Sequence, residues 1–227
     1  MFKQFLKEVK HGERVESELI KTLFYSLITS FLVLGFLWVI KLKNVDNFVS
    51  DYGFFLFFAV LSYAFLIPAI RQVRAYNEMP CMSGMMVGMT TGMIAGFLSG
   101  FFVASTNGMF VGSVFGMFIG ITLGAWNGKC CGVMGFLEGI MAGFMGGLMG
   151  AMTAFMLFND NLRPATIIVF IISAVILFSL NYMIYQDRRE FKREKKEGHF
   201  LTILLALILV SLTTWIIVFG PRSGVFG

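Results

Sequence analysis

Seven long apolar runs, separated by short polar connections, constrain the fold of this chain more than any other feature. The runs cover residues 22–40, 52–70, 82–103, 109–126, 133–158, 165–185 and 200–219. A helix needs about 20 apolar residues to cross the hydrocarbon core of a bilayer. Only helices and closed barrels satisfy their backbone polar groups there, and these runs are too long for barrel strands. We therefore predict an all-α polytopic membrane protein with seven transmembrane helices.

Lysine and arginine are distributed unevenly over the connections. If the N-terminus is cytoplasmic, fourteen of the 18 Lys and Arg residues lie inside and four outside. Because cytoplasmic loops of membrane proteins carry the excess of positive charge, we expect a cytoplasmic N-terminus and a C-terminus outside. This placement explains the net charge of +5 without a nucleic-acid partner. The basic loop 186–199 is read as a topology anchor, with an anionic-lipid site as the alternative.

Composition divides the chain into four segments. Residues 1–21 mix apolar and charged side chains and are expected to form a cytoplasmic interfacial segment. Residues 22–78 hold the first two helices and 159–227 the last two, all rich in Phe, Leu, Ile and Val. Residues 79–158 contain fourteen of the 16 methionines and all three cysteines. We predict that this segment forms a three-helix functional core flanked by two helix pairs.

Glycines recur every four residues along each helix of this core. The series are Gly84, Gly88, Gly92 and Gly96, then Gly112, Gly116, Gly120 and Gly124, then Gly139, Gly143 and Gly147. Small residues at this spacing let helix backbones approach closely in a membrane. Glycine is otherwise a poor helix former, so the repeats predict glycine-mediated packing between core helices.

Methionines follow a second pattern on the last core helix. Steps of three and four residues connect Met134, Glu138, Met141, Met145, Met149 and Met152. At about 100° per residue these side chains share one stripe, opposite the glycines. Continued to Met156, the stripe is about 33 Å long, enough to span the bilayer. The first core helix carries a similar ladder of Met82, Met85, Met86, Met89 and Met93. The two ladders could face each other, and the pattern leaves open whether the stripes face lipid, a neighbouring helix or a lumen.

Thioether sulfur gives these ladders a specific chemistry. It is a soft, neutral ligand of the kind that selects Cu(I). A row of weak neutral sites would pass a cation along without trapping it, as conduction requires. The alternative is that methionine acts only as an adaptable apolar filler.

Three cysteines and one glutamate add to the metal hypothesis. The predicted topology places Cys81, Cys130 and Cys131 at the cytoplasmic end of the ladders, where thiols stay reduced. They would capture or hand over a soft metal; the alternatives are small buried residues or a redox pair. Glu138 lies within the stripe, and charged side chains in a membrane usually face a bundle interior. It would attract a cation, carry a proton or, alternatively, bond to a neighbouring helix.

The motifs Met85-x-x-x-Met89 and Met141-x-x-x-Met145, beside helices with GxxxG repeats, resemble the core of CTR-type copper transporters. The resemblance covers residues 79–156 and implies a trimeric Cu(I) pore. The Met/Gly-rich core is also similar to that of bacterial membrane proteins. We therefore expect an integral protein of a bacterial or archaeal plasma membrane.

Two functions fit these patterns. The first is transport or binding of a soft metal ion, with Cu(I) as the substrate, in a homo-oligomer that serves a cytoplasmic metal acceptor. The second is a glycine-zipper channel or structural oligomer with no metal role. We expect no enzymatic activity, because no nucleophile–base pair, P-loop or dinucleotide fingerprint appears.

Overall fold

The computed structural model describes residues 15–40, 52–74, 81–129, 132–158, 160–187 and 199–221. No strand occurs in these ranges. The helices are α2 (Val15–Ile40), α4 (Gly53–Arg74), α5 (Cys81–Asn107), α6 (Met109–Gly128), α7 (Gly132–Met156), α8 (Leu162–Asp187) and α9 (His199–Phe219). All seven are long and apolar enough to cross a membrane, which confirms the predicted all-helical architecture with seven spans. The predictions made for residues 1–14 and for loop residues 188–198 lie outside the described residues.

Most helices extend beyond the apolar runs that predicted them. Hydropathy does not end a helix; a residue whose backbone leaves the helical conformation does. The connection between α5 and α6 shows this most clearly. From hydropathy it would cover residues 104–108, but Gly108 alone separates the two helices. Gly108 has a φ of 106°, a conformation that glycine adopts far more readily than other residues. The sharp turn holds α5 and α6 antiparallel and directly adjacent.

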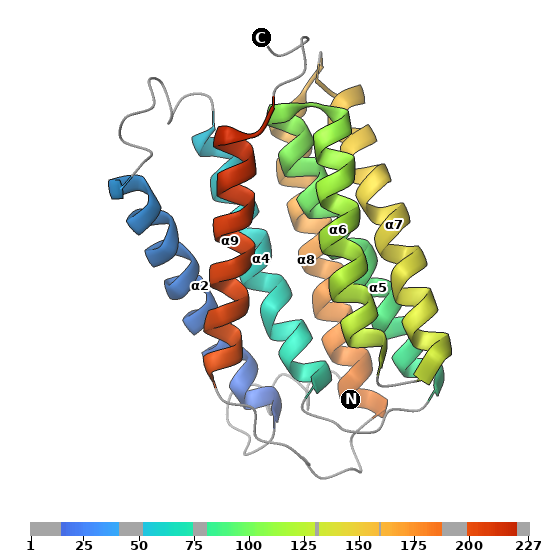
Figure 1. Cartoon of the computed structure of the whole chain (residues 1–227). Helices are drawn as coiled ribbons and strands as arrows, with labels where there is room; N and C mark the ends of the chain where they lie inside the picture. Colours follow the sequence, from blue (N-terminus) through green and yellow to red (C-terminus); the bar gives the residue numbers. More distant parts are fainter. Residues whose placement is uncertain are drawn as a thin grey trace.

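Helix α4 connects the two sides of the bundle. Figure 1 shows α2, α9 and α4 on one side and α5, α6 and α7 on the other. Helices α2, α8, α9 and α5 all pack against α4, and α2 also packs against α9. The other three flanking helices, α2, α8 and α9, thus meet around α4, the most buried of the four.

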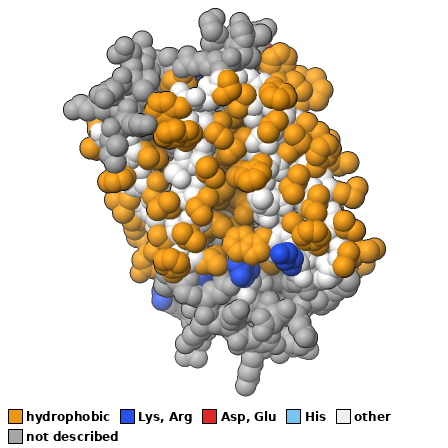
Figure 2. Space-filling model, in the orientation of Figure 1, with side chains coloured by type: hydrophobic (Ala, Val, Ile, Leu, Met, Phe, Trp, Pro, Cys, Tyr) orange, Lys and Arg blue, Asp and Glu red, His pale blue; other side chains and the backbone are white. Residues whose placement is uncertain are grey.

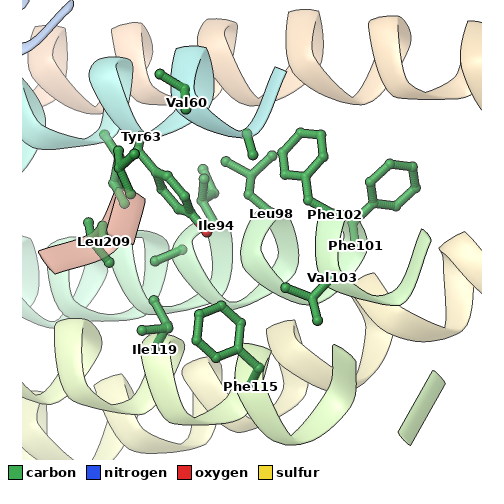
Figure 3. Close-up of a cluster of buried hydrophobic side chains, with 14 of the residues drawn as sticks. Val60, Tyr63, Ile94, Leu98, Phe101, Phe102, Val103, Phe115, Ile119 and Leu209 are labelled. Carbon is green, nitrogen blue, oxygen red and sulfur yellow. The ribbon is translucent and has the colours of Figure 1, made fainter. Parts of the chain in front are cut away.

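A core of large apolar side chains joins the two sides. In Figure 3, Tyr63 and Val60 from α4 lie beside Ile94 and Leu98 from α5, and Leu209 from α9 completes this part of the cluster. Phe115 and Ile119 extend the cluster onto α6. These side chains are almost completely removed from the surface. The aromatic and aliphatic residues therefore pack α4 against α5, while a different kind of contact packs α5 against α6 and α7.

That second contact is made by glycine backbones in four layers, each with one glycine from α5, one from α6 and one from α7. The layers are Gly88–Gly128–Gly135, Gly92–Gly124–Gly139, Gly96–Gly120–Gly143 and Gly100–Gly116–Gly147. A methyl group on Gly92 would come within 2.9 Å of the Gly139 carbonyl oxygen and 3.0 Å of the Gly124 Cα. The three backbones thus approach so closely that side chains are excluded between them.

The layers fix the register of the three-helix unit. Helices α5 and α7 run parallel with one constant offset in residue number, and α6 runs antiparallel to both. Beyond the last layer, Gly112 packs against Ala104, so the small-residue contact continues to the α5–α6 turn. Gly84 is buried at the other end of α5. We call this unit of α5, α6 and α7 the glycine core.

One end of the bundle carries most of the described positive charge. Lys21, Arg71, Arg74 and Lys129 all lie there, and we call it the basic end. Arg71 donates a hydrogen bond to the Thr22 hydroxyl at 2.9 Å, linking α4 to α2. The Arg74 guanidinium lies 4.5 Å from the Trp126 ring centroid. Figure 2 shows apolar side chains over the visible face and Lys and Arg only toward its lower part.

Candidate functional site

The methionine stripe of α7 lies on the outer surface of the glycine core. Met134 and Met141 are each 61% exposed, and Met145, Met149, Met152 and Met156 are also exposed. The opposite face of α7 is occupied by the glycine layers. Helices α5 and α6 pack against the glycine face of α7. The methionine side chains point away from that face, so they contact neither helix extensively. We call it the α7 methionine stripe.

The ladder of α5 is exposed too. Met82 is 81% exposed, Met86, Met89 and Met93 are exposed, and Met85 is partly buried. The two ladders therefore do not face each other within the subunit. The physical reason is the register: α5 and α7 turn their glycines toward each other, which leaves both sets of methionines outside. The narrow space between the two helices holds backbone atoms and cannot hold a row of thioethers.

A groove continues from the α5 ladder toward α8. It is a cavity of about 260 Å³ between the two helices. Met93, Ile94, Phe97 and Leu98 line one wall, and Val169, Ile172, Ser173 and Ile176 line the other. The Ser173 hydroxyl donates to the Phe170 carbonyl oxygen of its own helix at 2.9 Å. The groove therefore presents an almost wholly apolar surface and offers no polar ligand to an ion.

Glu138 lies within the α7 methionine stripe and is partly exposed. It lies about 9 Å along the helix axis from Gly132, where α7 begins at the basic end. No hydrogen-bond or ion-pair partner for its carboxylate occurs among the described residues. The structure therefore places a carboxylate at the basic end of the thioether row, as the sequence pattern indicated, but on an outer face.

Cys81 is the first residue of α5, but its side chain lies outside the described part of the structure, as do Cys130 and Cys131. Helix α6 ends at Gly128 and α7 begins at Gly132. Among the described residues, no three His, Cys, Asp or Glu side chains form a metal-binding group.

Among the described residues, exposed methionine occurs only in the glycine core. The exposed apolar residues of α8 are Ile167, Ile168, Ile171, Ile172, Val175, Ile176 and Phe178. Those of α2 and α9 are likewise Ile, Leu, Val, Phe, Tyr and Trp, without methionine. Within the described residues, the surface of α5, α6 and α7 thus differs in chemistry from the other membrane-facing surfaces of the same protein. Exposure to lipid alone does not account for this difference.

Several polar contacts that join α5 to α8 and α9 were not predicted from the sequence. Asn107 is buried at the α5–α6 turn, where its amide nitrogen donates to the Ile216 carbonyl oxygen at 2.9 Å and its carbonyl oxygen accepts from Thr106. Near the basic end, Ser83 of α5 donates to Asp187 of α8. A polar residue at the end of an apolar run is a weak signal for such contacts, and its partner cannot be read from the pattern.

Comparison of the chain with protein-family models, with curated proteins and with solved structures finds no match.

Proposed function

We propose that this protein binds a soft metal ion, with Cu(I) as the best chemical fit, and moves it along the α7 methionine stripe. The observation that carries the proposal is the restriction of exposed methionine to the glycine core, while the other helices present hydrocarbon side chains to the membrane. Thioethers differ from those side chains chiefly in their soft, polarisable sulfur. A function that uses sulfur would explain why they are concentrated on this face.

The proposed path runs outside the glycine core. Six methionines follow the face of α7 from Met134 to Met156, and Glu138 lies beside them near the basic end. Each thioether is a neutral donor, so successive sites would release a cation as well as bind it. The carboxylate of Glu138 would raise the local concentration of cations at that end of the path.

The basic end is the proposed cytoplasmic end, because positive residues are retained on that side of a membrane. Cys81, Cys130 and Cys131 belong to connections or helix starts at this end. We propose that they pass the ion to a cytoplasmic acceptor, since thiolates bind soft metals more tightly than thioethers. The membrane would be the plasma membrane of a bacterium or archaeon.

The test is Cu(I) binding by the purified protein under reducing conditions, measured against a competing chelator. The double substitution Met141→Leu/Met145→Leu is expected to remove binding sites, because leucine keeps the apolar volume and lacks the sulfur. Met183→Leu on α8, a methionine outside the stripe, is the matched control and should bind as the unsubstituted protein does. Equal binding by all three proteins would contradict a role for the stripe.

Transport requires a separate measurement. In proteoliposomes, uptake of Cu(I) is expected to be lost in Met141→Leu/Met145→Leu and lowered in Glu138→Gln, which keeps the shape of the side chain without its charge. The triple substitution Cys81→Ser/Cys130→Ser/Cys131→Ser should weaken tight binding and leave the thioether sites intact. Binding without any uptake would restrict the function to metal binding.

The second candidate is a structural membrane assembly without a metal role, and the glycine layers favour it. Their glycines are used within one subunit, so they are not available to line a pore between subunits. What they build is a rigid three-helix body. In that case the methionines would serve as an adaptable contact surface, and the Cu(I) measurement separates this candidate from the first.

A further inference from the structure

Two positively charged residues from different helices lie next to one indole ring at the basic end. The Arg74 guanidinium, in the last turn of α4, lies 4.5 Å from the centroid of the Trp126 ring on α6. Lys129 follows Trp126 by three residues and keeps helical backbone angles, with a φ of −58° and a ψ of −24°. Residues three apart are neighbours on a helix surface, so Lys129 lies one turn beyond Trp126 on the same side of α6. We call Arg74, Trp126 and Lys129 the Arg–Trp–Lys cluster.

The tryptophans place this cluster at the depth of lipid headgroups. Tryptophan is enriched where a membrane meets water. Trp38 and Trp215 lie near the ends of α2 and α9 that are remote from the basic end. Trp126 lies near the end of α6 at the basic end, and its side chain is 37% exposed. The two cations beside Trp126 are therefore at the level of lipid phosphates.

Lys129 presents its ammonium group to the surroundings of the bundle. Its side chain is exposed and makes no ion pair or hydrogen bond among the described residues. Of the described carboxylates toward this end, Asp187 accepts a hydrogen bond from Ser83 of α5. The other, Glu138, lies on the outer face of α7. The cluster thus suits an anion supplied from outside, and basic pockets between membrane helices recognise lipid headgroups in this way.

An apolar strip of α6 runs from the cluster into the membrane. Thr122, Phe118 and Val114 are reached from Trp126 in four-residue steps, and all three are exposed. The Thr122 hydroxyl donates to the Phe118 carbonyl oxygen at 2.8 Å, so its polar group is satisfied within the helix. A single ligand that covers this face is therefore anionic at the headgroup level and hydrocarbon deeper in the membrane. A soluble phosphate meets only the first requirement.

We propose that an anionic phospholipid from the leaflet at the basic end binds the Arg–Trp–Lys cluster. Its phosphate lies beside Arg74 and Lys129, and an acyl chain follows Phe118 and Val114. Helices α4 and α6 belong to different sides of the bundle (Figure 1), and each makes its extensive contacts with other helices. The bound lipid would therefore hold the end of α4 against the glycine core. The site is separate from the α7 methionine stripe and does not rest on the metal role.

Quenching of Trp126 fluorescence by lipids with brominated acyl chains tests the proposal. In a Trp38→Phe/Trp215→Phe background, Trp126 is the sole tryptophan. The full chain is reconstituted in phosphatidylcholine vesicles with a minor fraction of brominated phosphatidylglycerol or, in parallel, of brominated phosphatidylcholine. At equal fractions, we expect stronger quenching by the anionic lipid. Equal quenching by the two lipids would overturn the proposal.

Substitution of the cations identifies the residues that bind. Arg74→Gln and Lys129→Gln are each expected to lower the association constant for phosphatidylglycerol, relative to phosphatidylcholine, about five-fold, the equivalent of about 1 kcal/mol per cation. Lys21→Gln removes an exposed charge of α2 at the same end and is the matched control, which should leave the ratio unchanged. Unchanged quenching by brominated phosphatidylcholine shows that a variant keeps Trp126 at the membrane face, which a misfolded protein would not do. Equal losses in all three variants would assign the effect to general surface charge and overturn the site.

Inorganic phosphate distinguishes a lipid from a soluble anion. Added to the vesicles at constant ionic strength, it is expected to leave quenching by brominated phosphatidylglycerol unchanged, because it makes no contact with the apolar strip. Reversal of the quenching by phosphate, but not by chloride, would assign the cluster to a soluble phosphate and overturn the lipid.

Discussion

At the scale of single residues, glycine has two roles in this protein that the sequence does not distinguish. Gly143 lies against the backbone of Gly120, so any side chain there would overlap main-chain atoms. Gly35 of α2 has no atom within 4 Å of the position where its Cβ would stand. A side chain is therefore excluded at Gly143 and freely accommodated at Gly35, although both glycines occupy the interior of a helix.

Substitution of these glycines should have opposite effects. Gly143→Val is expected to destabilise the protein by about 3 kcal/mol or more, because the helices must separate to accept the side chain. Gly35→Ala is expected to leave stability unchanged or raise it by up to about 1 kcal/mol. Thermal unfolding in detergent measures both. A Gly143→Val protein as stable as Gly35→Ala would show that the close backbone contact does not form.

Asn107 offers a second test at this scale. Asn107→Leu removes the donor to the Ile216 carbonyl oxygen and the acceptor for the Thr106 hydroxyl. The Ile216 carbonyl oxygen still accepts from the Gly220 N–H, and the Thr106 hydroxyl still donates to the Val103 carbonyl oxygen. We therefore expect a loss of only about 0.5–1.5 kcal/mol in unfolding free energy, the net contribution of a typical hydrogen bond. Asn161→Leu, at an exposed position outside the helical core, is the control and should change stability much less.

At the scale of helices, α2 is held differently from the glycine core. Only a small share of α2 is buried inside the bundle. Its extensive contacts are with α4 and α9. A hydrogen bond from Arg71 of α4 to the Thr22 hydroxyl links α2 to its neighbour. The Arg71 side chain is only 7% exposed. A helix with few buried contacts separates from its neighbours at a low free-energy cost.

This difference predicts a selective effect of Thr22→Val. Loss of the hydroxyl should leave the Arg71 guanidinium with one fewer partner and increase amide hydrogen exchange in α2 while α5–α7 stay protected. Thr29→Val is the control, because Thr29 donates only to the Tyr25 carbonyl oxygen of its own helix. If both variants raise exchange equally, Thr22 does not act as a link between α2 and α4.

At the scale of the whole molecule, the charge distribution predicts that the basic end is cytoplasmic. In the cysteine-free background, Lys129→Cys should react with a membrane-impermeant maleimide only after the cells are permeabilised. Arg163→Cys, in the first turn of α8 at the opposite end of the bundle, should react in intact cells. The reverse pattern would invert the proposed topology and the proposed direction of metal hand-over.

The sequence by itself determined the elements and the faces of this protein. Hydropathy located all seven helices, and the three- and four-residue spacings placed Gly143 and Met145 on opposite faces of α7, where the structure has them. Both follow from local physics, since the length of an apolar run and the helical period involve only residues near in the chain.

The tertiary structure decided which face meets which neighbour. Helical spacing could not show that α5 and α7 share a glycine contact in parallel register, so that both methionine ladders point outward. Nor could it show that α4 is the helix shared by both sides of the bundle. These features depend on close packing among helices distant in sequence, where the shape of each backbone selects its partners.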